Sequence, residues 1–185
     1  MSVFPKRYAD RVARLRVTAG FVLVVAFAWL SQPDVRSLAI GLPVATLGLL
    51  LRAWATGHLE KDRRLAESGP YGYVRNPLYL GTLVVAAGFV IASQRWILAA
   101  VFAAAFILIY LPAIELEEQH LRDLFPEFAD YARRVPALLP RLRTAGRTGS
   151  FRWSMYVHNR EYQAFLGFLA GSILLAAKVL VRQMR

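Results

Sequence analysis

Charged residues are absent from five long stretches of this chain, and this segregation constrains its fold more than any other feature. Residues 17–33, 37–51, 78–94, 96–114 and 162–177 contain no Asp, Glu, Lys or Arg. Soluble domains carry charge every few residues along each helix face, and disordered chains lack such apolar runs. A bilayer core of roughly 30 Å needs about 20 helical residues. The pattern therefore predicts an all-α polytopic membrane protein with about five transmembrane helices.

The length predicts a single membrane-embedded domain, 1–185, whose last span covers 162–181. The chain has no cysteine, which excludes disulfides and thiolate metal sites. His58 and His120 have no ligand partner at a useful spacing, so no metal is predicted. The net charge of +11 is explained by basic residues that set the orientation in the membrane and contact anionic lipid. No nucleic-acid partner is therefore expected.

The basic residues predict an orientation. Most of them lie in 1–16, 57–77 and 115–161, with Arg52 left inside the second span, and the opposite side has only Arg36, Arg95, Lys178, Arg182 and Arg185. The positive-inside rule then places the N-terminus and both long connecting segments in the cytoplasm. Because the connections on the far side are short, any chemistry must be cytoplasmic. A bacterial inner membrane is the expected location.

The first connecting segment ends in a turn and a helix start. Gly69-Pro70-Tyr71-Gly72 has turn chemistry, and Asn76-Pro77 is typical of an N-cap followed by the first helical residue. In the simplest interpretation Asn76 only caps, Arg75 touches lipid phosphate and the tyrosines form an interfacial belt. In the alternative, the first N–H groups of the helix, the adjacent Arg75 and the glycine turn form an anion cup, which suits a carboxylate or phosphate. Nearby tyrosine rings would attract a sulfonium.

The second connecting segment carries two adjacent carboxylates. Pro112 is expected to kink the helix of the fourth span, and Glu117 and Glu118 extend its apolar stripe, Glu117 with Leu121 and Leu124 and Glu118 with Leu121 and Phe125. Glu115 is expected on the opposite, wet side. Like charges on a packed face need a compensating cation, ligand or proton, so the pair is a candidate functional site. The alternative is structural: Glu118 pairs with Arg122, and Glu117 reaches towards water.

A short amphipathic helix is predicted to begin at Pro126-Glu127 and to end before Pro136. It would cover a pocket at the membrane interface. Residues 141–150 resemble a basic loop on anionic lipid, and 158–162 form either an interfacial anchor or a second pocket wall. Small residues predict helix packing at Gly41, Gly48, Gly81 and Gly88, and Gly167-x-x-x-Gly171 in the last span admits a homodimer.

Together, the two segments resemble one family. Residues 69–81, GPYGYVRNPLYLG, resemble the G-P-Y-x-x-x-R-H-P-x-Y-x-G signature of the isoprenylcysteine carboxyl methyltransferase and phospholipid methyltransferase superfamily. Its second signature is resembled by a later set of residues: Glu117-Glu118, Leu121, Phe125, Tyr131, Val135-Pro136 and Leu139-Pro140. The match covers residues 57–140 in the family's order. One residue departs from the pattern: Asn76 stands where the family usually has His, so this position cannot titrate near neutrality.

The resemblance implies an integral membrane enzyme that uses S-adenosylmethionine in a cytoplasmic pocket open to the bilayer. Its implied cofactor-binding residues are Tyr71, Tyr73, Val74, Arg75, Asn76, Pro77, Tyr79, Gly81, Glu117 and Glu118. Arg75 and Glu118 are the implied catalytic residues, with Glu118 as base if the acceptor is an amine. The predicted substrate-side residues are Tyr131, Arg134, Asn159, Arg160 and Glu161.

The predicted function is methyl transfer from S-adenosylmethionine to a lipophilic acceptor, the carboxylate or amine of a lipid-tailed molecule. Two alternatives stay open. One is a nicotinamide-dependent reductase of the steroid-reductase type, which needs more phosphate-binding residues than Arg75 and its neighbours supply. The other is a non-enzymatic protein that binds lipid or a partner, and Asn76 is its main support.

Overall fold

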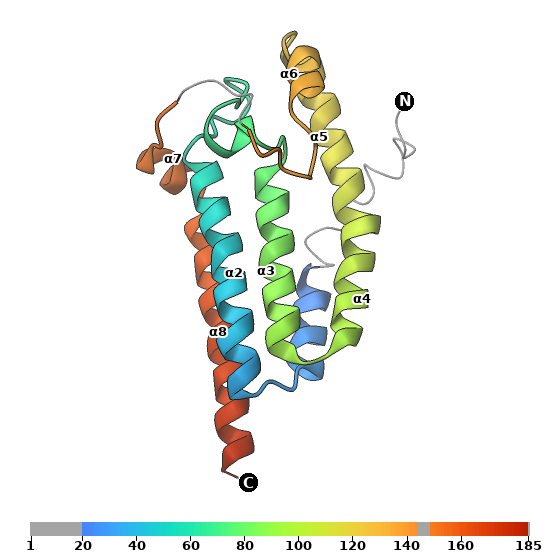
Figure 1. The fold of residues 1–185 in the computed structure, drawn as a ribbon, viewed down its shortest axis with the longest axis vertical. Coiled ribbons are helices and arrows are strands. Elements are labelled where there is room, and N and C mark those ends of the chain that lie inside the picture. Colours follow the sequence, from blue (N-terminus) through green and yellow to red (C-terminus); the bar gives the residue numbers. More distant parts are fainter. Residues whose placement is uncertain (1–19, 144–148, 185) are drawn as a thin grey trace. The chain divides into compact units, whose positions relative to one another are not determined.

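The computed structural model describes residues 20–143 and 149–184, and within them the chain is helical, with no β-strand. Figure 1 shows the elements in order. They are a helix at Gly20–Leu30, α2 (Val35–Thr56), the 3-10 turn η1 (Gly69–Gly72), α3 (Pro77–Ser93), α4 (Trp96–Ala105), the π-helical turn η2 (Phe106–Tyr110), α5 (Leu111–Leu124), α6 (Phe128–Arg134), α7 (Trp153–His158) and α8 (Tyr162–Gln183). The predicted all-α class is confirmed.

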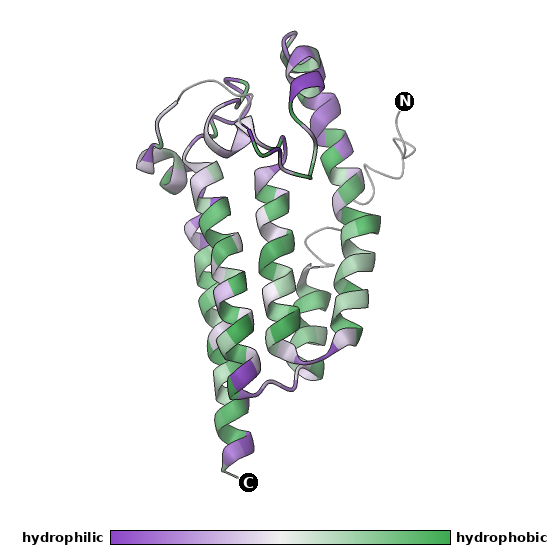
Figure 2. Ribbon diagram, viewed as in Figure 1, coloured by the Kyte–Doolittle hydropathy of each residue, from purple (hydrophilic) through white to green (hydrophobic). Residues whose placement is uncertain are grey.

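Within the described residues, three helices are long and apolar enough to cross a membrane: Val35–Thr56, the continuous helix Trp96–Leu124, and Tyr162–Gln183. They correspond to the predicted second, fourth and fifth spans. The helices Gly20–Leu30 and Pro77–Ser93 are apolar but shorter, so five spans stay a prediction. In the ribbon of Figure 2, hydrophobic residues along α4 give way to hydrophilic residues along α5.

The chain divides into two compact units. The first comprises the described residues of Met1–Ala45, Ala86–Glu118 and Phe168–Arg185, and the second comprises those of Thr46–Val85 and Gln119–Gly167. In the first unit, Phe27, Ala92, Leu98 and Leu175 form a buried apolar core. In the second, the buried core consists of Leu65, Phe128, Tyr131 and Val135.

Glycines let α2 and α3 approach closely, as their spacing predicted. In the first unit, a Cβ on Gly41 would lie 2.5 Å from the Gly88 carbonyl oxygen. In the second, a Cβ on Gly48 would lie 2.6 Å from the Gly81 carbonyl oxygen. Only a residue without a side chain fits such backbone contacts. In α8, the space beside Gly171 is filled by Phe89, whereas Gly167 has nothing within 4 Å. The homodimer through these two glycines stays a prediction.

Proline shapes the fourth apolar helix. Pro112 has no N–H to donate to the preceding turn, and the segment just before it, Phe106–Tyr110, is a π-helical turn. The helix type thus changes just before Pro112, after which α5 continues to Leu124, and the kink at Pro112 stays a prediction.

The predicted short amphipathic helix is α6. Phe128 and Tyr131 on its inner face are 1% and 2% exposed, and Val135 just after it is 1% exposed. Leu121 and Phe125 of the preceding segment pack against the same core. This packing orders the 125–137 connection beside the first signature segment.

Parts of the predicted organisation fall on residues that the structure does not describe. The basic N-terminal segment before residue 17, the first residues of the predicted first span and Arg147 of the basic loop lie outside the described residues. The cytoplasmic orientation and the inner-membrane location stay predictions.

Candidate functional site

The turn of the first signature forms as predicted. Gly69–Gly72 is a 3-10 turn, and Gly69 has φ +59°, a left-handed conformation that glycine adopts without strain. A Cβ on Gly69 would lie 2.6 Å from Cδ2 of His58, so the turn also needs glycine for space. Tyr71 within the turn and Val74 after it are 6% and 2% exposed, which anchors the segment in the second unit.

The helix start at the end of this segment is also confirmed. α3 begins at Pro77, and the Leu80 N–H donates to the Asn76 carbonyl oxygen at 3.0 Å as its first helical bond. Asn76 is 8% exposed, and its Nδ2 donates to the Ala137 carbonyl oxygen at 3.2 Å. Asn76 therefore joins a helix start to the segment that carries the second signature.

Backbone hydrogen bonds join the two signature segments along several residues. The Arg75 N–H donates to the Pro136 carbonyl oxygen at 2.8 Å, and the Asn76 N–H donates to that of Ala137 at 3.2 Å. The Arg141 N–H donates to the Tyr73 carbonyl oxygen at 3.0 Å. Segments about sixty residues apart thus lie side by side within one unit.

The guanidinium of Arg75 reinforces this junction. Its Nη1 donates to the carbonyl oxygens of Ala132 at 2.7 Å and Val135 at 3.0 Å. These groups lie at the C-terminal end of α6, where helix carbonyls lack helical partners and a cation is favourable. Arg75 thus holds α6 beside the start of α3.

The aromatic candidates have different surroundings. The ring of Tyr73 is half-buried and lies 6.4 Å from that of Trp54. Tyr79 is half-buried in the first turn of α3, and Pro77 before it is buried. Tyr131, predicted on the substrate side, lies in the apolar core instead, where its hydroxyl donates to the Tyr71 carbonyl oxygen at 2.9 Å. Gly81 packs against α2.

The predicted carboxylate pair lies on α5, in the first unit. Glu118 is half-buried, whereas Glu117 and Leu124 are exposed. The apolar stripe thus runs through Glu118, Leu121 and Phe125, and the prediction that Glu117 and Leu124 lie on it is wrong. Glu115, expected on the wet side, is half-buried.

The other predicted substrate-side residues are held by the chain itself. Arg134 is exposed, and its Nη2 lies 3.4 Å from Oε1 of the buried Glu67. Asn159 Nδ2 donates to the Leu59 carbonyl oxygen at 3.0 Å. Arg160 is exposed with φ +54°, and Glu161 is 7% exposed in an ion pair with Arg52.

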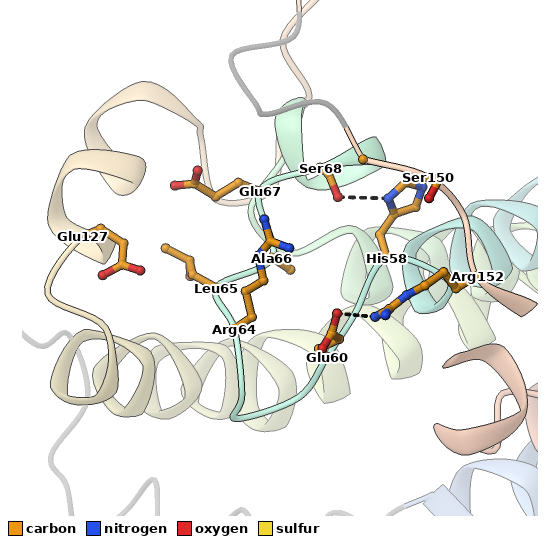
Figure 3. Close-up of a pocket in the computed structure, with 11 residues that line it drawn as sticks. His58, Glu60, Arg64, Leu65, Ala66, Glu67, Ser68, Glu127, Ser150 and Arg152 are labelled. Carbon is orange, nitrogen blue, oxygen red and sulfur yellow. Dashed lines mark hydrogen bonds and ion pairs between the residues drawn. The ribbon is translucent and has the colours of Figure 1, made fainter. Parts of the chain in front are cut away.

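A polar cavity of about 260 Å³ lies in the second unit, beside the first signature. It is lined by His58, Glu60, Arg64, Leu65, Ala66, Glu67, Ser68, Glu127, Gly149, Ser150 and Arg152. Figure 3 shows the Glu67 and Glu127 carboxylates on one side and the His58–Ser68 and Glu60–Arg152 pairs on the other. The lining thus offers both signs of charge. None of the predicted cofactor-binding residues lines it.

Two residues that sequence reasoning left aside have defined roles here. His58 Nδ1 lies 3.0 Å from Ser68 Oγ, and burial lowers the pKa of His58 from its ordinary 6.5. Arg52, noted only as a charge inside a span, forms the pair with Glu161. A lone charge in an apolar run could have pointed to Arg52, because such residues in spans are typically paired. Across the described residues, no group of three or more His, Cys, Asp or Glu side chains is arranged to hold a metal ion.

Comparison with known proteins gives a consistent family. The model of the family described as phospholipid methyltransferase matches residues 15–127. The cobalt-zinc-cadmium resistance protein CzcN of Cupriavidus metallidurans is 34% identical over 157 residues, which cover 80% of this chain and 70% of CzcN. The nickel-cobalt-cadmium resistance protein NccN of Alcaligenes xylosoxydans xylosoxydans is 31% identical over 93% of this chain and 84% of its own. No solved structure matches the chain significantly.

Proposed function

Because this chain belongs to the phospholipid methyltransferase family, we propose that it transfers a methyl group from S-adenosylmethionine to a lipid-tailed acceptor at the cytoplasmic face of a membrane. The acceptor group is a carboxylate or an amine. The part of the chain that the structure describes has three helices long and apolar enough to span a bilayer, which supports a substrate that the protein meets in the membrane.

One observation carries the proposal: the two signature segments, remote in the sequence, are bonded to each other. Arg75 and Asn76 of the first segment bond backbone groups between Ala132 and Ala137 of the second. This is the arrangement that a site built from both signatures requires.

The donor set fits the cofactor. The anion cup, formed by the first N–H groups of α3, the adjacent Arg75 and the glycine turn, would hold the amino-acid carboxylate. The ring of Tyr73 suits the sulfonium. By resemblance to the second signature, Glu117 and Glu118 would take the ammonium group and the ribose hydroxyls. When bound, S-adenosylmethionine supplies an electrophilic methyl group.

The protein's own residues then mainly bind, orient and exclude water, since an in-line displacement depends on near-attack geometry. A carboxylate acceptor is already nucleophilic. An amine acceptor has to lose a proton, and we assign this step to the Glu118 carboxylate. Asn76 is assigned to hydrogen bonding alone, because an amide does not titrate.

We place the polar end of the acceptor in the cavity beside the first signature. Its lining carries carboxylates and guanidinium groups, so it can meet either charge on a headgroup. Arg134, a predicted substrate-side residue, supports this placement because it lies beside the lining residue Glu67.

A second candidate function comes from the names of the two relatives, which are called metal resistance proteins. We propose that this chain contributes to resistance to divalent metals, and that this contribution depends on its methyl transfer. A strain without the protein, complemented with the native chain or with Glu118→Gln, tests this on cobalt and zinc. Equal resistance with both would contradict the link.

Calorimetric titration of the purified protein in detergent tests the cofactor assignment. We expect saturable binding of S-adenosylhomocysteine and none of a reduced nicotinamide dinucleotide. The Tyr73→Ala variant should bind more weakly, because it removes the proposed aromatic face. Binding of the nicotinamide alone would favour the reductase alternative, and binding of neither would contradict the proposed function.

A further inference from the structure

Arg52 is a charged residue near the C-terminal end of the apolar helix α2, and its side chain is only 23% exposed. A guanidinium in such a place is costly unless its donors are paired. Four hydrogen bonds pair them. Nε and Nη2 donate to the two carboxylate oxygens of Glu161 at 2.7 and 3.0 Å. Nη1 donates to Thr82 Oγ1 at 2.6 Å and to the Leu78 carbonyl oxygen at 3.3 Å.

Space for this side chain is built into the helix pair. A Cβ on Gly81 would lie 2.5 Å from Cγ of Arg52, so any larger residue there would displace the arginine stem. Gly81 is the last residue of the first signature. In the structure a Cβ there would meet the Arg52 stem and, at 2.8 Å, the Gly48 carbonyl oxygen.

The other partner, Glu161, belongs to the segment 152–161, which is hydrogen-bonded to the residues just after the end of α2. The Arg152 N–H donates to the Gly57 carbonyl oxygen at 2.9 Å, and Asn159 donates to that of Leu59. These bonds satisfy carbonyl groups just beyond the helix end. The segment lies outside the 15–127 match to the family model. Arg52 is thus paired partly within that match, by Leu78 and Thr82, and partly beyond it, by Glu161.

We propose that Arg52 is a positioning residue for the anion cup, and that Glu161 orients Arg52. This rests on the proposed function. Leu78 and Thr82 lie in the first two turns of α3, directly after Asn76 and Pro77. By bonding both, Arg52 fixes the turn from which the cup's N–H groups point. A bidentate carboxylate partner fixes the guanidinium plane in turn.

The test is calorimetric titration with S-adenosylhomocysteine, with thermal unfolding measured on the same samples. For Arg52→Met we expect affinity to fall by about tenfold or more, as for loss of a charged hydrogen bond. Arg63→Met removes an exposed arginine of the same unit and should keep native affinity. Equal affinities of the native chain and Arg52→Met would overturn the proposal. No binding by the native chain would instead overturn the proposed function.

A double variant separates positioning from stability. Arg52→Met with Glu161→Leu replaces the buried pair by apolar residues, which often restores stability. If Arg52 positions the anion cup, the double variant should recover the native stability but bind S-adenosylhomocysteine about tenfold more weakly than the native chain. The reason is that Met cannot form hydrogen bonds with Leu78 and Thr82. Recovery of both together would show a purely structural role.

Arg52→Lys covers the case in which the double variant does not fold. Lysine keeps the charge but cannot reach Glu161, Leu78 and Thr82 together. We expect an affinity between those of the native chain and Arg52→Met. Native affinity in Arg52→Lys would overturn the proposal.

Discussion

Single residues decide how closely the helices of this protein approach. A Cβ on Gly81 would lie 2.5 Å from Arg52 Cγ and 2.8 Å from the Gly48 carbonyl oxygen. Gly81→Ala should therefore lower the free energy of unfolding by about 1–3 kcal/mol, the usual cost of overpacking. Thermal unfolding in detergent measures it.

Gly167 is the matched control, because a Cβ there meets nothing within 4 Å. Gly167→Ala should raise the free energy of unfolding by about 0.5–1 kcal/mol through helix propensity. Effects of the same sign at both positions would contradict this account of packing.

His58 gives the second prediction at this scale. Burial lowers its pKa below 6.5, so the unfolded chain binds a proton where the folded chain does not. His58 therefore lowers stability as the pH falls through about 6.5, and its penalty is absent well above that value. The melting temperature should fall more between about pH 7.5 and 5.5 in the native chain than in His58→Gln. Identical shifts would show that other groups dominate.

At the scale of elements, α5 carries the predicted contribution of the second signature. Replacing Glu117 and Glu118 by Gln should weaken S-adenosylhomocysteine binding by about 1.5–3 kcal/mol for each charged hydrogen bond lost. The apolar contacts of α5 remain, so the fold should be intact. Glu115→Gln on the same helix is the control. Native affinity in a folded double variant would remove these carboxylates from the site.

Elements differ in how much the sequence says about them. The turn at Gly69–Gly72, the helix start at Pro77 and the helix α6 were predicted, because glycine, proline and apolar spacing act locally. The pair of Arg52 with Glu161 was not, because 109 residues separate them and no local rule joins them. The face of Glu117 was assigned wrongly because spacing alone does not say which side of a helix is covered.

At the scale of the whole molecule, the segregation of charge predicted an all-helical chain with apolar helices long enough to span a membrane. The polar cavity could not be predicted, since it forms where residues 58–68, 127 and 149–152 meet. Likewise, no residue pattern predicted the hydrogen bonds between the signature segments. Orientation in the membrane is a further property at this scale.

The orientation can be tested in a chain without native cysteine. Ser150→Cys and Gln32→Cys place single thiols at exposed positions of the two predicted sides. In intact cells, an impermeant thiol reagent should label Gln32→Cys and spare Ser150→Cys, and both should react after permeabilisation. Labelling of Ser150→Cys in intact cells would reverse the predicted topology.

The central claim is methyl transfer, and incorporation of label tests it most directly. Purified protein in vesicles of bacterial lipid extract is incubated with S-adenosylmethionine labelled in the methyl group. We expect labelled methyl groups in the organic extract and an equimolar amount of the product S-adenosylhomocysteine. In the Glu117→Gln, Glu118→Gln variant, the amounts of labelled lipid and of this product should both fall strongly. A folded native protein that binds S-adenosylhomocysteine but leaves every extracted lipid unlabelled would contradict the account.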